Sequence, residues 1–269
     1  MYIDWDQDKN KKPCKPQEPY ASDFMSVEEV GGGVRICVSK AHKFGTDALI
    51  LSDFAMPKKW ETACDLCAGC GIVAFLWFRR EQRPRHVYAV DIQSEAAELM
   101  KESARLSGLS GFAPVLGDLR GPLPIPAGSL DLITCNPPYS AEGTGILSLD
   151  PSDRAARHEL LCTLDDVFAA AKRLLRYRGR ICICHLPHRL SDVITSMRAN
   201  GFEPKRLRFC QGRPDKAPWL VLVEGKLGGN PGGLKVEPVF LLEQNGVSTP
   251  EAKALYSLYR ESNNKLIFK

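Results

Sequence analysis

The chain lacks the long apolar segments that membrane and secreted proteins carry. The run IVAFLWF, residues 72–78, is far too short to cross a bilayer. The N-terminal stretch MYIDWDQDKNKK is acidic and then basic, and it has no apolar core of the kind found in signal peptides. A large excess of one charge is also missing, because the formal net charge is only +4. We therefore expect a cytoplasmic protein without a membrane partner, for which an anionic partner is permitted but not required.

The chain does have enough apolar material for one large domain. It contains 269 residues, of which 44% are apolar, so a substantial core can form. Neither an internal repeat nor a long linker divides it. Residues 1–22, rich in Lys, Asp and Pro, are predicted to be a mobile tail, and residues 23–269 a single domain with short N- and C-terminal extensions. The 10 cysteines are expected to be reduced thiols, as is usual in the cytoplasm.

Alternating strand and helix patterns predict βαβ units and a parallel sheet. The expected strands are 61–66, 86–91, 130–136 and 180–185, each followed by a helical pattern. Ser94 is expected to cap one helix, and the capping box TLDD, residues 163–166, to open another that stops at Gly179. The segments 204–210 and 219–225 have no helix between them and predict an antiparallel hairpin. The predicted fold class is therefore α/β, a Rossmann-like doubly wound, mostly parallel seven-stranded sheet with this hairpin at its edge.

The stretch ACDLCAGCG, residues 63–71, can be interpreted in two ways. Its cysteines recur every third residue, a spacing that can hold a metal or an iron–sulfur cluster. The same residues match the end of a strand and a loop that opens a helix, where Gly69 and Gly71 let the backbone approach a ligand closely. A ferredoxin-like cluster would need a further cysteine where Ala74 stands, which favours the glycine loop and no metal. A metal-binding interaction protein remains the non-enzyme alternative.

Acidic residues follow three successive predicted strands. Asp65 precedes the glycine loop, Asp91 ends the next strand, and Asp118 follows the third. A carboxylate at the position of Asp91 can accept both hydroxyls of a ribose, and an adenine ring could rest beside Asp118. Each of the three alone is as well explained as an ordinary turn residue. Their common register at the ends of the strands favours a nucleotide-like cofactor.

The motif NPPY, residues 136–139, follows the fourth predicted strand and is the most specific signal in the chain. Its two prolines fix the backbone, so the Asn136 side chain and the Pro137 carbonyl can point at one place as hydrogen-bond acceptors. Together they match a planar amine, which has two N–H donors. Tyr139 offers a face on which a ring can stack. The alternative is a proline-rich loop with a purely structural asparagine.

These motifs, in this order, resemble the class I S-adenosylmethionine-dependent methyltransferases. Their Asn-Pro-Pro-Tyr variant is similar to that of enzymes that methylate amide or exocyclic amine nitrogens. The segments FGTDALILSDFA, ARHE, RLRFCQGRPDKAPWLVLVEG and TPEAKALY further resemble the bacterial tRNA(Val) adenine-N(6) methyltransferase family, over residues 24–258. That family modifies the adenine beside the anticodon of a tRNA.

The resemblance implies S-adenosylmethionine as cofactor and assigns roles to residues of this chain. The implied cofactor-binding residues are Thr46, Asp47, Asp65, Cys67, Gly69, Gly71, Asp91, Ile92, Asp118, Leu119 and Asn136. The implied catalytic residues are Asn136, Pro137, Pro138 and Tyr139. One position departs from the family pattern Asp-Leu-Gly-x-Gly-x-Gly, because Cys67 stands in place of the first glycine. The loop is expected to form if Cys67 keeps a negative φ.

The implied partner is the anticodon loop of a tRNA, with no obligate protein partner. Basic residues that could contact its phosphates are Lys205, Arg206, Arg208 and Arg213, together with Arg157 and His158 after the NPPY loop. A run of charges is also typical of a merely solvated face. Ribosomal RNA adenine, DNA adenine and the glutamine of release factors remain alternative substrates. A sequence-specific DNA enzyme would need a recognition domain, and release-factor enzymes carry an N-terminal helical domain, for which this chain has little room.

Overall fold

The computed structural model describes residues 26–81, 83–138 and 162–262. The predicted tail, residues 1–22, lies outside the described residues, as do Tyr139, Arg157 and His158. Within the described parts of the chain, no helix combines the length and the apolar character that crossing a membrane requires.

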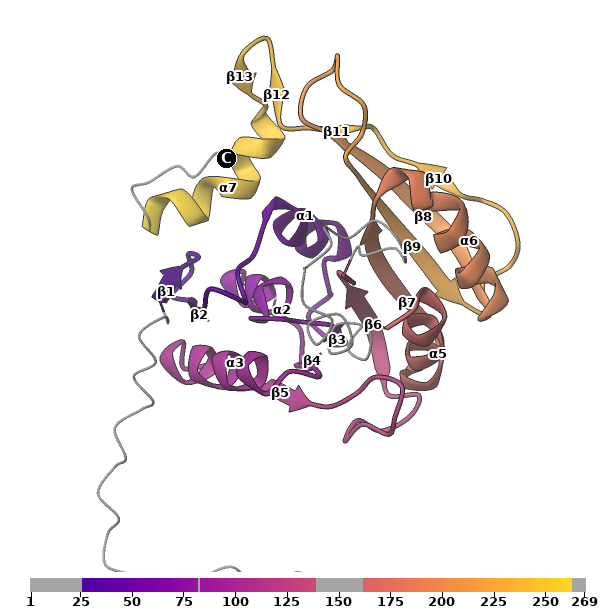
Figure 1. Ribbon diagram of the computed structural model, residues 1–269, viewed down its shortest axis with the longest axis horizontal. Coiled ribbons are helices and arrows are strands. Elements are labelled where there is room, and N and C mark those ends of the chain that lie inside the picture. The colour runs from indigo at the N-terminus through magenta and orange to yellow at the C-terminus, as the bar shows by residue number, and fades with distance from the viewer. Residues whose placement is uncertain (1–25, 82, 139–161, 263–269) are drawn as a thin grey trace, which may run out of the picture.

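A nine-stranded sheet forms the centre of the molecule (Figure 1). Its order is β10-β8-β9-β7-β6-β3-β4-β5, and β11 also pairs with β8. The strands are β3 (Thr62–Leu66), β4 (His86–Asp91), β5 (Phe112–Leu116), β6 (Leu130–Cys135), β7 (Leu175–His185), β8 (Phe202–Gln211), β9 (Leu220–Leu227), β10 (Lys235–Val236) and β11 (Phe240–Leu241). The pairs from β5 through β7 are parallel, whereas β9 runs antiparallel to both β7 and β8.

This topology confirms the predicted doubly wound, mostly parallel sheet and adds detail at one edge. The expected antiparallel hairpin is formed by β8 and β9, and its second strand, β9, lies between β7 and β8. The two-residue strands β10 and β11 then pair in parallel with β8 and extend the seven strands to nine.

Helices cover both faces of the sheet, as a doubly wound fold requires. They are α1 (Thr46–Ala55), α2 (Ile72–Leu76), α3 (Ser94–Leu106), α5 (Leu164–Leu174), α6 (Leu190–Ala199) and α7 (Pro250–Ser262), with 3₁₀ turns η1 (Trp77–Arg79) and η2 (Pro187–Arg189). Two-stranded ribbons are formed by β1 (Ser26–Glu29) with β2 (Arg35–Val38) and by β12 (Glu243–Gln244) with β13 (Val247–Ser248). One core cluster packs α1, α2 and α3 on one face, and a second packs α5 and α6 on the other.

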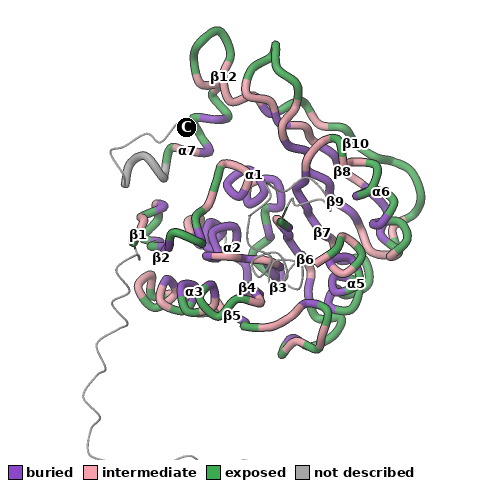
Figure 2. Tube along the Cα trace, viewed as in Figure 1, coloured by how far each residue is buried: buried purple, intermediate pink, exposed green. Residues whose placement is uncertain are grey.

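Each buried strand contributes side chains to both core clusters, because successive side chains of a strand point to opposite faces of the sheet. In β7, Cys182 and Cys184 enter the cluster beneath α1, while Ile181 and Ile183 enter the cluster beneath α5. All four are fully buried. Figure 2 shows the centre of the sheet around β7 and β9 as buried. The expectation that Cys182 and Cys184 are core residues on one face is therefore confirmed.

Two predicted helix boundaries were wrong. The helix opened by TLDD ends at Leu174, and β7 begins at once, well before Gly179. Arg178 has φ 68, and the pairing of β6 with β7 shifts register nearby, so this stretch is an irregular strand start rather than a helix end. Ser94 is the first helical residue and not a cap, since Gln93 takes the cap position without a side-chain bond. The capping box is confirmed, with Thr163 and Asp166 bonding each other's backbone N–H groups.

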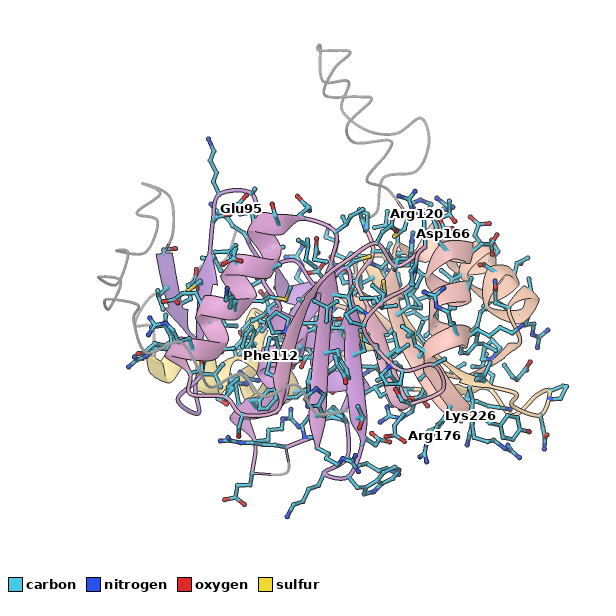
Figure 3. The ribbon with its side chains drawn as sticks, turned by 90° about the horizontal axis from the view of Figure 1, so that it is seen from below. Glu95, Phe112, Arg120, Asp166, Arg176 and Lys226 are labelled. Carbon is cyan, nitrogen blue, oxygen red and sulfur yellow. The ribbon has the colours of Figure 1, made fainter. Side chains whose placement is uncertain are left out.

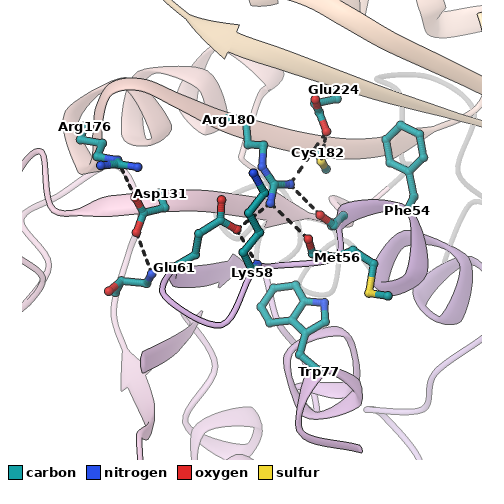
Figure 4. A network of polar contacts seen from close by, with 12 residues as sticks. Phe54, Met56, Lys58, Glu61, Trp77, Asp131, Arg176, Arg180, Cys182 and Glu224 are labelled. Carbon is teal, nitrogen blue, oxygen red and sulfur yellow. Dashed lines mark hydrogen bonds and ion pairs between the residues drawn. The ribbon is translucent and has the colours of Figure 1, made fainter. Parts of the chain in front are cut away.

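A buried ion-pair network ties the end of α1 to the sheet (Figure 4). The Arg180 guanidinium lies 2.7 Å from the Glu61 carboxylate and donates to the carbonyl oxygens of Ala55 and Met56 at 2.6 and 3.2 Å. Glu61 also accepts from the backbone N–H of Lys58 at 2.8 Å. The network thereby anchors the chain between α1 and β3, directly ahead of the glycine loop.

Glu61→Ala is expected to lower the free energy of unfolding by about 3 kcal/mol, because it leaves the mostly buried Arg180 guanidinium without its nearest carboxylate. Glu98→Ala is the matched control, since Glu98 pairs with Lys101 on an exposed helix face and such pairs contribute little. Urea unfolding of both variants measures the difference. Equal losses in the two would contradict the structural role of Glu61.

Candidate cofactor and catalytic site

The carboxyl ends of β3, β4, β5 and β6 meet at one end of the sheet. Figure 3 shows Glu95, Arg120 and Asp166 at this end, and Arg176 and Lys226 at the opposite one. Ligands of open α/β sheets bind at the carboxyl ends of parallel strands. A pocket lies there, and six residues predicted from the sequence line it: Cys67, Asp91, Ile92, Asp118, Leu119 and Pro138.

The glycine loop between β3 and α2 takes left-handed backbone angles at three positions. Gly69 has φ 54 and Gly71 has φ 81, and a Cβ on Gly71 would lie 2.9 Å from both Met100 Cγ and Phe75 Cε2. Glycine is therefore required at position 71 by conformation and by packing. Cys67 also has a positive φ, of 55, so the expectation of a negative φ at this residue was wrong. The loop forms nonetheless, with a strained cysteine where the family pattern has glycine.

Cys67→Gly is expected to raise the free energy of unfolding by about 1 kcal/mol relative to Cys67→Ala, because only glycine adopts a left-handed φ without a steric penalty. Both variants lose the thiol contacts of Cys67, so their difference isolates the backbone strain. Thermal and urea unfolding measure it. If the alanine variant were as stable as the glycine variant, the strain at this position would be refuted.

Asp91 organises the glycine loop from the neighbouring strand. Its Oδ2 accepts from the backbone N–H of Gly69 at 2.8 Å, and its Oδ1 accepts from that of Gln93 at 2.9 Å. The residue is only 6% exposed. A carboxylate has about four acceptor positions, so Asp91 keeps capacity for further donors on the pocket side. This fits the predicted bonding of ribose hydroxyls.

Asp65 is a buried acid beneath the same loop. It is 1% exposed, and its Oδ1 accepts from the Thr134 hydroxyl at 2.7 Å. Burial raises the pKa of Asp65 to about 7, with the nearby Asp91 charge adding to the rise and the Thr134 bond opposing it. Such a carboxyl group can gain or lose its proton when a cation binds next to it.

Stability of the protein is expected to fall as pH rises from about 4 to about 7, because Asp65 must ionise inside the fold at a pKa above the ordinary value of 3.8. The sign follows from the raised folded-state pKa: the protonated form is favoured in the fold, and the full penalty is present above pH 7. Asp65→Asn should flatten this part of the pH profile while keeping an acceptor for Thr134. Urea unfolding across this pH range tests it, and an unchanged slope in the variant would disprove the assignment.

Asp118 and Leu119 form the rim of the pocket beyond β5. The Asp118 carboxylate bonds the Arg120 guanidinium at 2.7 Å and the Arg120 backbone N–H at 2.9 Å, and these bonds lower the pKa of Asp118. Leu119 is buried, and its carbonyl accepts from Arg173 at 3.0 Å. The rim therefore combines an apolar side chain with a polar one.

The Asn136 side chain at the end of β6 is held between two other elements. Its Nδ2 donates to Asp47 Oδ2 at 2.9 Å, and its Oδ1 accepts from the Cys184 thiol at 3.1 Å. Asp47 belongs to the first turn of α1, whose Thr46 hydroxyl lies 2.7 Å from the Tyr256 hydroxyl of α7. The structure thus places Asp47 in contact with Asn136, and Thr46 precedes Asp47 in the chain. Their cofactor-binding role stays a prediction.

Sequence reasoning missed two members of this arrangement. Cys184 is the last residue but one of β7, the strand that pairs with β6. The pairing of these two strands was the only signal that could have shown Cys184 near Asn136. Tyr256 comes from the C-terminal helix, and no local pattern marks its contact with Thr46. Its hydroxyl links α7 to the first turn of α1, 210 residues away in the chain.

The cysteines of ACDLCAGCG point to different parts of the molecule. Cys64 is buried in the core cluster beneath α5, whereas Cys70 is buried in the cluster beneath α1. Among the residues that the structure describes, no group of three or more His, Cys, Asp and Glu side chains could hold a metal ion. The spacing of the cysteines along the chain therefore does not bring them into one ligand set.

The predicted phosphate-binding residues of β8 already have partners within the molecule. Arg206 bonds Glu224 at 2.9 Å and stacks on the Phe54 ring at 3.9 Å, and Arg208 bonds Glu251 at 2.7 Å. These contacts give both arginines partners within the fold, and their predicted contact with RNA stays a prediction. The other two predicted residues also have partners within the molecule. The Lys205 ammonium group donates to backbone carbonyl oxygens, and the Arg213 guanidinium lies 3.4 Å from the Asp215 carboxylate. None of the four lines the described pocket.

The fold and the position of the pocket fit a methyltransferase of the S-adenosylmethionine-dependent class. The chain belongs to the methyltransferase domain family, whose model matches residues 57–221. This membership confirms the predicted class and its cofactor, S-adenosylmethionine. The fold is also similar to that of a predicted O-methyltransferase from Agrobacterium tumefaciens, at a TM-score of 0.60 and 16% identity over 80% of this chain and 97% of that one. At such identity the likeness concerns the fold alone.

Two relatives are more specific in name. The chain is 29% identical over 161 residues to the tRNA1(Val) (adenine(37)-N6)-methyltransferase of Aeromonas salmonicida, covering 60% of this chain and 66% of the relative. It is 26% identical over 216 residues to the protein of the same name from Tolumonas auensis, covering 80% of this chain and 88% of the relative. The match to the Aeromonas protein thus spans just under two thirds of that protein's length.

Proposed function

We propose that this protein transfers a methyl group from S-adenosylmethionine to the exocyclic amine of adenine in tRNA, at the position beside the anticodon, in the cytoplasm. The observation that carries the proposal is the position of the Asn136 side chain at the end of β6. This side chain donates a hydrogen bond to Asp47 and lies next to the pocket that Pro138 lines. The names of the relatives support the choice of tRNA adenine as substrate.

The pocket residues fit the parts of the cofactor. Asp91 would bind the ribose hydroxyls with the acceptor capacity that its two backbone bonds leave. Asp118 and Leu119 would flank the adenine ring, with Ile92 lining the same pocket. Gly69 and Gly71 would line the methionine part.

An acidic residue and the start of α1 would also contact the methionine part of the cofactor. The buried Asp65 would face the amino group, whose positive charge offsets the unfavourable ionisation of this carboxyl. Thr46 and Asp47 would close this end of the site from the first turn of α1.

The cofactor supplies a methyl group on a positively charged sulfur, and its transfer is an in-line displacement. Placement of donor and acceptor therefore contributes most of the rate. Asn136 Oδ1 and the Pro137 carbonyl would accept the two N–H groups of the target amine, which turns the nitrogen lone pair towards the methyl group. The weak S–H bond from Cys184 to Asn136 Oδ1 would yield to the stronger N–H donor. The methylated amine loses its proton easily, so no strong general base is needed.

The target base would have to leave its stack to reach Asn136. In the proposal, Tyr139 stacks on the flipped base, and Arg157 and His158 contact the anticodon loop. Arg213 and Lys205 remain candidate phosphate contacts, and so do Arg206 and Arg208, which also have partners within the fold. Phosphate contacts predict that tRNA binding weakens steeply as salt rises.

Methyl transfer from labelled S-adenosylmethionine to unmodified total tRNA, followed by nucleoside mass spectrometry, tests the proposal. N(6)-methyladenosine is the expected product. Absence of incorporation by a protein that binds the cofactor would refute tRNA as substrate. Ribosomal RNA and release-factor protein, assayed in parallel, would then show whether an adenine or a glutamine is used instead.

A further inference from the structure

Three thiols from three separate elements meet beside the pocket, and the proposed methyl transfer uses none of them. Cys67 lies in the glycine loop, Cys135 at the end of β6, and Cys162 just ahead of α5. The sulfur atoms of Cys67 and Cys162 are 3.6 Å apart, and Cys67 also hydrogen-bonds with Cys135. Cys67 and Cys162 both line the pocket, whereas Cys135 is fully buried behind them.

We propose that Cys67 and Cys162 are a modification site, at which a peroxide forms a reversible disulfide, and that this disulfide and the bound cofactor exclude each other. The exclusion rests on the cofactor position given under the proposed function. The disulfide itself does not, because it depends only on the two sulfur atoms and an oxidant.

The chemistry balances with hydrogen peroxide as the oxidant. One thiol loses its proton, and the thiolate sulfur attacks an oxygen of the peroxide, so that the O–O bond breaks and a sulfenic acid forms. The hydroxide released takes up the thiol proton and becomes one molecule of water. The second thiol attacks the sulfenic sulfur, forms the S–S bond and releases a second molecule of water. Two electrons pass from the two sulfurs to the peroxide, and both thiol protons end in water. A dithiol reductant such as dithiothreitol reverses the reaction by thiol–disulfide exchange.

The geometry favours this pair over other cysteine pairs of the described chain. A disulfide needs the sulfurs about 2 Å apart, so the sulfur atoms of Cys67 and Cys162 must approach by roughly 1.5 Å from their contact distance. Both residues are partly exposed on the pocket side, so an oxidant can reach them. Cys135 also contacts the sulfur of Cys67, but it has no exposed surface, so we do not expect an oxidant to reach it.

The surroundings make the reaction slow at neutral pH. Hydrogen bonding with Cys135 and burial raise the pKa of the Cys67 thiol, and hydrogen bonding with Cys67 and burial raise that of Cys162. Asp91 faces Cys67 and Asp166 faces Cys162, and both carboxylates add to the rise. Arg120, at the rim of the same pocket, is the basic group opposite them. Because thiolates react with peroxide and thiols do not, the disulfide should form faster as pH increases.

The exclusion follows from where the bond would lie. Cys67 and Cys162 line the same pocket as Asp91 and Leu119, the residues proposed to hold the ribose and the adenine. A bond between them ties the glycine loop to the residues ahead of α5 at the wall of that pocket, which fixes the wall in one arrangement. Conversely, a ligand in the pocket covers both sulfurs and shields them from the oxidant.

The test uses the full chain, treated with hydrogen peroxide with and without saturating S-adenosylhomocysteine, then digested without reduction and mapped by mass spectrometry. The expected result is one linked peptide pair, Cys67 with Cys162, lighter by two hydrogen atoms, whose formation S-adenosylhomocysteine slows at least about tenfold. Dithiothreitol should reverse it. Cys162→Ser should abolish the linked pair, and Cys210→Ser, a change at a buried cysteine of another strand, should leave it.

Three results would overturn the proposal: no linked pair, a link through Cys135 instead of Cys162, or equal rates of linkage with and without S-adenosylhomocysteine. The mass change is read on the protein without any substrate RNA. Failure of methyl transfer to tRNA therefore cannot be mistaken for failure of the disulfide.

Discussion

Asn136→Ala is expected to reduce kcat for methyl transfer by about 100- to 1,000-fold and to leave the Kd of S-adenosylhomocysteine within about threefold of the parent. The reason is that Asn136 Oδ1 would bind the target amine in the transition state, whereas Asp91 and the glycine loop would bind the cofactor. Single-turnover methylation of tRNA and calorimetric titration with S-adenosylhomocysteine measure the two quantities separately.

Asn200→Ala is the matched control for this variant. Asn200 also donates its side-chain amide to an aspartate, Asp165, but it does so at the end of α6 and away from the pocket. It should leave kcat unchanged. If Asn136→Ala retained near-normal turnover, Asn136 would be a structural residue of the loop, and the proposed catalytic role would be wrong.

Asp91→Asn is expected to raise the Kd of S-adenosylhomocysteine by about 30- to 100-fold, on the order of 2–3 kcal/mol. An amide in place of the carboxylate loses the charge-assisted bonds to the ribose hydroxyls. It also weakens the bonds from the backbone N–H groups of Gly69 and Gln93, which set the shape of the glycine loop. Isothermal titration calorimetry measures the change.

Asp131→Asn provides the matched control for Asp91→Asn. The Asp131 carboxylate also accepts from a backbone N–H, that of Thr62 at 2.8 Å, but it lies at the start of β6 and so at the opposite end of the sheet. It should reduce stability without changing cofactor affinity. A cofactor affinity that Asp91→Asn left intact would show that the ribose is bound elsewhere.

Much of this site was accessible from the sequence because its parts are local. The strand ends that carry Asp65, Asp91 and Asn136 follow clear hydrophobic patterns, and parallel strands place their carboxyl ends together. The capping box at Thr163 is likewise a contact between near neighbours in the chain. For such features, the residue types and their spacing already fix the geometry.

The parts that sequence reasoning missed depend on long-range packing. Whether Arg206 faces solvent or Glu224 is decided by the pairing of β8 with β9, which charge patterns do not show. The positive φ of Cys67 is imposed by the turn from β3 into α2, against the preference of the residue itself. The contact between Cys67 and Cys162 joins residues 95 positions apart.

Cys67, the cysteine in the glycine loop, belongs both to a local sequence motif and to contacts made by long-range packing. Its position in the motif identified the loop, but its strain and its neighbouring thiols became visible only in three dimensions. Both features lie beside the pocket, where Cys67→Gly would remove the strain together with the thiol that contacts Cys162.

The most direct test of the account is methyl transfer to two synthetic anticodon stem-loops that differ in one base. One carries adenine beside the anticodon, and the other carries purine, which lacks the exocyclic amine, at the same position. Only the adenine stem-loop is expected to gain a methyl group, recovered as N(6)-methyladenosine. Equal methylation of both stem-loops, or methylation of neither by a protein that binds S-adenosylmethionine, would contradict it.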